Sequence, residues 1–214
     1  MFYLNNVKYK HILSIDSLEI KKHKITCIVG ESGSGKSTLL RLLNKLISCD
    51  KGEIYYNNIP YQTIASVNLR RKVVMLPQLP AIFDGSIRDN LLIGLAFAEK
   101  PEADDKKLHS ILEMVHLDKP LDNNSELLSG GEKQRLALGR ILLLEPEVFL
   151  LDEPSSALDE ETERIIIEKL IAYVKETNKT LIMVTHSKKI ALTYADDVIE
   201  IQQGRVIRMR EVDQ

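Results

Sequence analysis

Residues 25–38 read ITCIVGESGSGKST. An apolar run is followed by a glycine-rich turn and then by a lysine and a serine, at the spacing G-x-x-x-x-G-K-[S/T]. Glycines let the backbone curl until successive N–H groups point at one anion, and a following helix aims its positive end at the same place. The stretch therefore predicts a strand, a phosphate-binding loop and a helix.

All residues of the loop are expected to contact phosphate, and two of them carry specific chemistry. Lys36 is expected to reach the β- and γ-phosphates of a nucleotide, and the Ser37 hydroxyl to bind Mg²⁺. The expected phosphate-binding residues are Gly30, Glu31, Ser32, Gly33, Ser34, Gly35, Lys36, Ser37 and Thr38.

Acidic residues end a second apolar run, VFLLDEP at 148–154. Asp152 would lie at the carboxyl end of a buried strand, where ligands gather in open α/β sheets, and could hold Mg²⁺. Glu153 would then activate or orient the attacking water. Strands that end in acids are common, so this interpretation depends on the phosphate loop upstream.

Gln78 and His186 also follow apolar runs, VVMLP and TLIMVT. The Gln78 amide could contact Mg²⁺ or the water, and His186 could donate a hydrogen bond to the γ-phosphate. Taken alone, Gln78 is typical of a surface position and His186 of a structural histidine.

Composition sets broad limits on the protein. The 214 residues suffice for one buried core with a lobe inserted into it. The net charge of −2 gives no sign of nucleic-acid binding, and two cysteines make no disulfide framework. No run reaches the ~18 apolar residues of a membrane span. We expect an intracellular protein whose membrane partner, if it has one, is another subunit.

Strand and helix patterns alternate at both ends of the chain, which favours a parallel sheet covered by helices. Between 79 and 128 the pattern changes to a small helical lobe, with a solvated loop expected at 99–107. The other expected elements are strands within 1–29, at 53–56, 73–76, 148–151, 180–185, 197–201 and 204–209, and helices at 36–47, 160–176 and 187–194.

A second anion-binding pattern is LLSGGEKQR at 127–135, here called the signature segment. Ser129 and Glu132 have the spacing of a capping box, so a well-capped helix is one interpretation. Capping does not explain Gly130 and Gly131, because adjacent glycines weaken a helix. They would leave backbone N–H groups exposed at its first turn.

These motifs, together with SALD at 156–159, occur in an order that resembles the ATP-binding subunit of an ABC (ATP-binding cassette) transporter along essentially the whole chain. The resemblance implies an α/β fold of the P-loop NTPase class, an ABC-type nucleotide-binding domain with a parallel-sheet core, an N-terminal antiparallel β subdomain and an inserted helical subdomain. It implies one domain over 1–214, with 1–78 and 147–214 as the ATP-binding core and 79–146 as the helical part.

The resemblance also implies a function. Such cassettes bind ATP and Mg²⁺ and pair head to tail in the presence of ATP, so that each nucleotide lies between two copies. Ser129, Gly130 and Gly131 would act on the other copy's ATP, and Asp159 would lie along the dimer seam. Hydrolysis would drive a separate transmembrane permease, with this chain on the cytoplasmic face of a bacterial cell membrane.

Some details stay open at this stage. Tyr9 is the candidate for stacking on adenine, with Tyr3 and His11 as rivals. Residues 69–91 look most like a subgroup proposed to export iron or other metals, and next like phosphate importers. The alternative function is that of a soluble ABC ATPase in DNA repair, translation or iron–sulfur assembly.

Overall fold

The computed structural model describes residues 1–212, except for the side chain of Lys188. The chain forms two compact units, and each is described by itself. The first unit comprises Met1–Met75, Glu147–Glu153 and Asn178–Gln214, and the second comprises Leu76–Pro146 and Pro154–Thr177.

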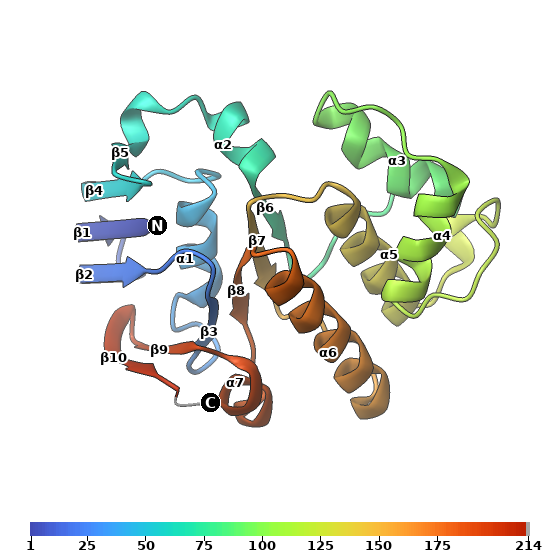
Figure 1. Ribbon diagram of the computed structural model, residues 1–214. Coiled ribbons are helices and arrows are strands. Elements are labelled where there is room, and N and C mark those ends of the chain that lie inside the picture. The colour runs from blue at the N-terminus through green and yellow to red at the C-terminus, as the bar shows by residue number, and fades with distance from the viewer. Residues whose placement is uncertain (213–214) are drawn as a thin grey trace. The chain divides into compact units, whose positions relative to one another are not determined.

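The first unit is built on two sheets (Figure 1). The smaller, antiparallel sheet has the order β2-β1-β4-β5, with β1 Phe2–Tyr9, β2 Leu13–Ile20, β4 Lys51–Tyr56 and β5 Ile59–Pro60. The larger has the order β10-β9-β3-β8-β7-β6, with β3 Ile25–Val29, β6 Val73–Leu76, β7 Val148–Asp152, β8 Thr180–Val184, β9 Asp197–Gln202 and β10 Arg205–Glu211.

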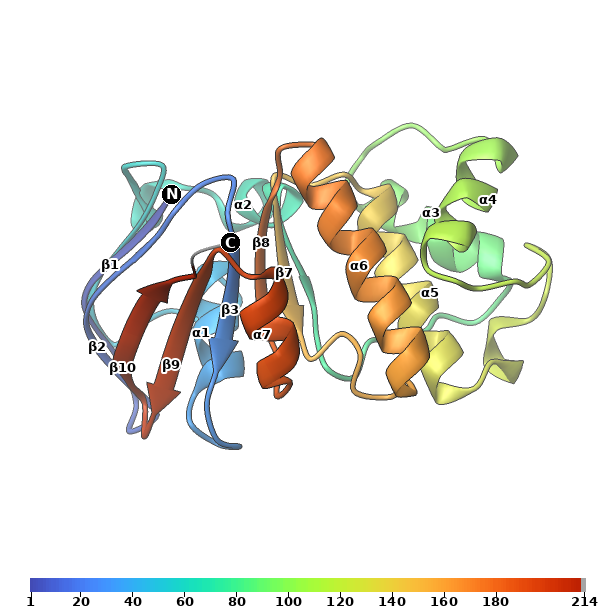
Figure 2. The ribbon, with the colours of Figure 1, turned by 60° about the horizontal axis from the view of Figure 1, so that its bottom comes forward.

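The predicted parallel core is confirmed, because β3 pairs in parallel with both β8 and β9, and β7 pairs in parallel with β8. Every residue of β7 and β8 is buried, as expected for strands covered on both faces. Helix α1 (Lys36–Leu43) lies between the two sheets, and its leucines share one hydrophobic core with β1, β2 and β3 (Figure 1). Helix α7 (Lys188–Tyr194) contacts β3 (Figure 2).

The second unit is mostly helical. Its helices are α3 (Ile87–Phe97), α4 (Asp105–Met114), α5 (Gly130–Leu143) and α6 (Glu160–Glu176), with a short 3₁₀ turn η2 at Ser125–Leu127. Helix α5 packs against both α3 and α4, and eight of its residues are buried. Within residues 1–212, no helix is both long enough and apolar enough to cross a membrane.

Several predicted boundaries were wrong. Helix α1 ends at Leu43, not at 47, because Lys45 takes a left-handed backbone with φ 58°. Helix α4 begins at Asp105, inside the segment predicted as a loop, because the Asp104 carboxylate caps it by accepting the Lys107 N–H at 2.8 Å.

Helix α2 (Ser66–Lys72) and the 3₁₀ turn η1 (Tyr61–Thr63) were not predicted. By its contacts, α6 groups with the second unit, while the predicted division into 1–78 with 147–214 and 79–146 stays a prediction.

Candidate active site

The phosphate loop of the first unit leaves β3 at Gly30 and enters α1 after Gly35. Gly30 has φ 148°, and a Cβ atom there would lie 2.1 Å from the Ile201 carbonyl oxygen, so only glycine fits. The Gly204 N–H, in the β9–β10 turn, donates to the Ser34 carbonyl at 3.0 Å. The loop is therefore anchored to a neighbouring part of the same sheet.

The phosphate loop holds the ammonium group of Lys36 in place. Lys36 Nζ donates to the carbonyls of Gly30 at 2.8 Å and Glu31 at 2.7 Å. Burial lowers the pKa of Lys36, while nearby Glu153 and Asp152 oppose that shift. The Ser34 hydroxyl is buried and has no hydrogen-bond partner among residues 1–212, and no side chain caps the start of α1. Spare polar atoms and a fixed ammonium fit the phosphates of a nucleotide.

The metal ligands expected from the sequence lie together in the first unit. Ser37 Oγ donates to Asp152 Oδ1 at 3.0 Å, although 115 residues separate them. Asp152 is 3% exposed, and burial raises the pKa of its carboxyl group. A hydroxyl beside a carboxylate is an oxygen-only ligand set of the kind that Mg²⁺ prefers, with phosphates and water completing its shell. The residues present therefore fit this ion.

Glu153 and His186 also meet, at the ends of the neighbouring strands β7 and β8. His186 Nε2 lies 2.7 Å from Glu153 Oε1. Glu153 has a left-handed backbone with φ 51°, a conformation that costs about 1 kcal/mol or more and is found at functional sites. The sequence placed each residue at a strand end, but not in contact with the other.

The three candidates for adenine stacking have different surroundings in the structure. Asn6 has φ 49°, and a register shift between Asn5 and Lys8 turns Tyr9 onto the inner face of the sheet, where it packs against the core. Tyr3 faces the other side and lies next to Tyr55, with ring centroids 6.2 Å apart. Lys10 Nζ lies 5.3 Å from the centre of the Tyr9 ring. His11 is exposed in the turn that follows β1.

The signature segment lies in the second unit and begins α5. Ser129 Oγ accepts the Glu132 N–H at 3.3 Å, and Glu132 Oε2 accepts the Ser129 N–H at 2.8 Å, which completes the predicted capping box. A Cβ atom on Gly131 would lie 3.0 Å from the Ala157 carbonyl oxygen, whereas one on Gly130 would meet nothing within 4 Å. Packing therefore accounts for Gly131 and leaves Gly130 without a structural reason.

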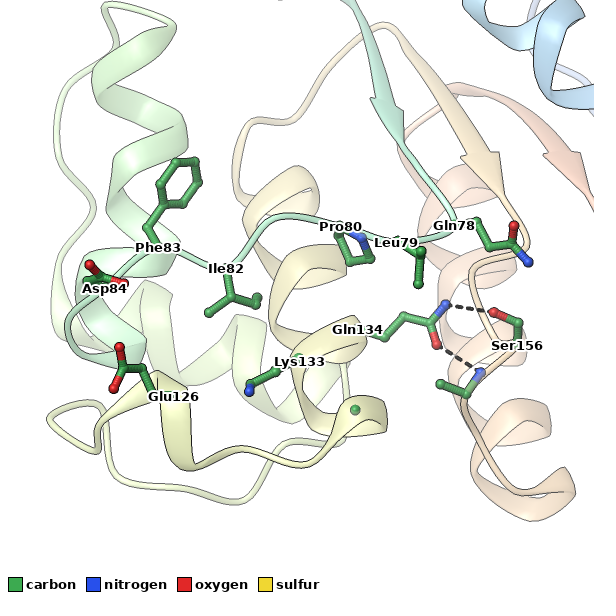
Figure 3. Close-up of a pocket in the computed structure, with 12 residues that line it drawn as sticks. Gln78, Leu79, Pro80, Ile82, Phe83, Asp84, Glu126, Lys133, Gln134 and Ser156 are labelled. Carbon is green, nitrogen blue, oxygen red and sulfur yellow. Dashed lines mark hydrogen bonds between the residues drawn. The ribbon is translucent and has the colours of Figure 1, made fainter.

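Gln78 and Asp159 also belong to the second unit. Asp159 caps α6 by accepting the Thr162 N–H at 3.0 Å, and that hydrogen bond lowers the pKa of its carboxyl group. Gln78 lines an open cavity of ≈ 500 Å³ (Figure 3). The other lining residues are Leu79, Pro80, Ile82, Phe83, Asp84, Glu126, Gly130, Lys133, Gln134, Ser156 and Ala157.

Sequence reasoning missed two polar side chains of α5 in this unit. Gln134 is 3% exposed and bonds to the segment around Ala157. Arg140 donates to the Asn90 carbonyl at 2.7 Å and the Ala81 carbonyl at 2.9 Å, and burial lowers its pKa to about 10. Arg140 interrupts the apolar stretch LALGRILL, a signal that could have singled it out, whereas Gln134 stands in the polar run EKQR at 132–135 and gives no such signal.

A family model described as "ABC transporter" matches residues 13–156. The chain belongs to the ABC transporter family. It is 39% identical over 201 residues to Protein STAR1 of Oryza sativa, covering 94% of this chain and 58% of the rice protein. It is 37% identical over 211 residues to the phosphate import ATP-binding protein PstB of Aeropyrum pernix, covering 92% of this chain and 83% of PstB. The chain thus spans little more than half of the first relative.

Solved structures of ABC proteins agree with the fold. A dimeric post-hydrolysis state of the ATP-binding cassette MJ0796, bound to ADP and Pi, has a TM-score of 0.90 at 28% identity, with 100% of both chains covered. A bacterial Atm1-family ABC exporter with ATP bound has a TM-score of 0.88 at 26% identity, covering 98% of this chain and 38% of the exporter. The predicted fold class, an ABC-type P-loop NTPase, is confirmed, and this chain is an ABC ATPase domain.

Asp152→Asn is expected to stabilise the ABC domain at neutral pH. Because burial raises the pKa of Asp152, folding disfavours its charged form, and asparagine keeps the Oδ1 acceptor for Ser37. The gain should be complete above the raised pKa of the folded state and should vanish as pH falls toward 3.8, the ordinary value. Calorimetric Tm values across this range provide the test, and a lower Tm for Asp152→Asn at pH 7 would contradict it.

Alanine at the two signature glycines should separate packing from binding. Gly131→Ala is expected to be less stable than Gly130→Ala by about 1 kcal/mol, because only the former crowds the Ala157 carbonyl. Gly130→Ala should match or exceed the parent, since alanine favours helix. Urea unfolding of the purified chain measures the difference, and the reverse order would show that Gly130 has a structural role.

Proposed function

We propose that this chain binds ATP with Mg²⁺ on its first unit and hydrolyses it as half of a head-to-tail homodimer that drives a separate membrane subunit. The observation that carries the proposal is the hydrogen bond of 3.0 Å between Ser37 Oγ and Asp152 Oδ1. It joins the phosphate loop to the acidic end of β7, so one small region offers both hydrogen-bond donors for phosphate and ligands for a metal ion.

The residues of the first unit divide the chemistry among them. Mg²⁺, when bound, neutralises charge on the phosphate oxygens. Lys36 and the loop N–H groups hold the β- and γ-phosphates. Glu153 orients the attacking water and draws its proton, and His186, 2.7 Å from Glu153 Oε1, orients that carboxylate. The His186 side chain is 54% exposed, so a γ-phosphate can also reach its ring.

The second unit supplies the groups for the other copy's nucleotide. Ser129 and Glu132 cap each other, and Gly130 presents open backbone at the positive end of α5. Asp159 and the residues before it would line the seam. Gln78 has no such role toward the other copy and would respond to the bound metal or the attacking water. Two-fold pairing then gives two equivalent sites. The dimeric structures of MJ0796 support this arrangement by similarity.

The cavity beside Gln78 is the proposed contact with the membrane subunit, which would place the chain on the cytoplasmic face of the membrane. Leu79 is 90% exposed beside it, and Leu127 is 85% exposed. Tyr9 stays the proposed residue for stacking on adenine, through the part of its ring that the core leaves uncovered, since the side chain is only partly buried. Export of a metal stays a prediction from residues 69–91. The relatives named above do not favour it over other cargoes, nor do they favour a soluble ABC ATPase.

Glu153→Gln is expected to bind ATP normally, to lower hydrolysis by about 10²–10⁴-fold and to accumulate as an ATP-bound dimer. The amide can still hold the water but cannot take its proton. Steady-state phosphate release and analytical ultracentrifugation with ATP and Mg²⁺ measure the two effects. Unchanged turnover would remove Glu153 from its proposed role.

Ser129→Arg, added to the Glu153→Gln background, tests whether the signature segment acts on a second copy. The larger side chain should occupy the space where the other copy's nucleotide would bind and so prevent dimer formation, while a single chain still binds ATP through Lys36. If Ser129→Arg instead abolished ATP binding by the monomer, the signature segment would not act on a second copy.

A tagged Glu153→Gln chain with ATP should recover a polytopic membrane protein in stoichiometric amount from detergent-solubilised native membranes. Leu79→Asp, at a side chain that is 90% exposed, should fold normally and lose that partner. If the Glu153→Gln chain recovered only soluble partners, and Leu79→Asp recovered the same ones, the soluble ABC class would be favoured.

A further inference from the structure

Residues 155–159, here called the SALD loop, connect the end of β7 to α6 and are fixed on α6 at both ends. Ser155 Oγ hydrogen-bonds to the Glu163 carboxylate of α6. Asp159 accepts the Thr162 N–H at 3.0 Å, and Leu158 N–H donates to the Ser155 carbonyl at 3.0 Å. These bonds shape the loop but do not tie it to the signature segment.

Gln134 of α5 makes that connection by contacting the middle of the SALD loop. Its Oε1 accepts the Ala157 N–H at 3.1 Å, and its Nε2 lies 3.4 Å from Ser156 Oγ (Figure 3). Gln134 is 3% exposed, so its amide is committed to this contact away from bulk water. A buried amide left without these partners would cost stability, which is why the two segments stay together.

The first turn of α5 is shaped to receive the loop. Gly131 lies three residues before Gln134, on the same face of the helix. A Cβ atom on Gly131 would lie 3.0 Å from the Ala157 carbonyl oxygen and 3.2 Å from Leu158. Gly131 therefore lets the loop approach closely, and Gln134 holds it there.

We infer that Gln134 is a positioning residue that fastens the SALD loop to α5, so that Ser129, Gly130 and this loop meet the second copy as one preformed surface. The inference rests on the proposed head-to-tail dimer. Holding both segments before association removes the entropic cost of ordering them during closure. Glutamine suits the role because one side chain both accepts from Ala157 and donates to Ser156.

Gln134→Leu in the Glu153→Gln background tests the inference, because leucine fills a similar volume and makes neither hydrogen bond. ATP affinity of the monomer should stay within about twofold. The Kd of the ATP-bound dimer should rise about tenfold, which corresponds to the loss of roughly one net hydrogen bond. Gln134→Glu, which keeps the acceptor for Ala157, should give an intermediate Kd. Sedimentation equilibrium and nucleotide titration measure the two quantities.

Arg140→Met is the matched control, because it also removes buried hydrogen bonds from α5 but leaves the SALD loop untouched. It should lower Tm without changing the dimer Kd. An unchanged Kd for Gln134→Leu would overturn the inference. Equal losses for Gln134→Leu and Arg140→Met would do so as well, because the effect would then be general destabilisation.

Hydrogen exchange on the monomer keeps this test separate from the proposed function. The Ala157 amide should exchange faster in Gln134→Leu than in the parent, and at the parental rate in Arg140→Met. If the Glu153→Gln parent failed to dimerise with ATP, the proposed function would fall. Exchange at Ala157 would then still report whether Gln134 holds the loop, and unchanged exchange would overturn that part independently.

Discussion

Parallel pairing of β3, β8 and β7 is the constraint on which the candidate site depends. Parallel strands end at the same edge of a sheet, so residues far apart in sequence arrive together. The phosphate loop after β3, the acids at the end of β7 and His186 after β8 all follow from this geometry. The Ser37–Asp152 and Glu153–His186 contacts are its local consequences.

The same chain carries a second, physically different candidate anion surface at the start of α5. There a capping box satisfies Ser129 and Glu132 between themselves, so the remaining N–H groups of the first turn are free to face a ligand. Gly131 is explained by its closeness to Ala157, and Gly130 is not explained by packing. A glycine that weakens a helix and that no packing contact requires indicates a surface that contacts a ligand or another molecule.

Sequence reasoning found the features that depend on local chemistry and missed those that depend on register. The phosphate loop and the capping box are encoded by spacing alone, so both were predicted. The Glu153–His186 contact requires knowing that β7 and β8 are neighbours, and the inward turn of Tyr9 requires the irregularity near Asn6. Gln134 was missed because a glutamine within the polar run EKQR looks like a surface residue, and its partner lies 23 residues away.

At the candidate active site, burial makes the charged forms of two side chains costly for folding. Burial raises the pKa of the Asp152 carboxyl group and lowers that of the Lys36 ammonium, so both charged forms are disfavoured by the fold that holds them. A divalent cation beside Asp152 and phosphate oxygens beside Lys36 would favour those same charged forms. The two residues whose charged forms folding disfavours would therefore gain from a bound nucleotide and its cation, and this gain would couple ligand binding to the stability of the folded chain.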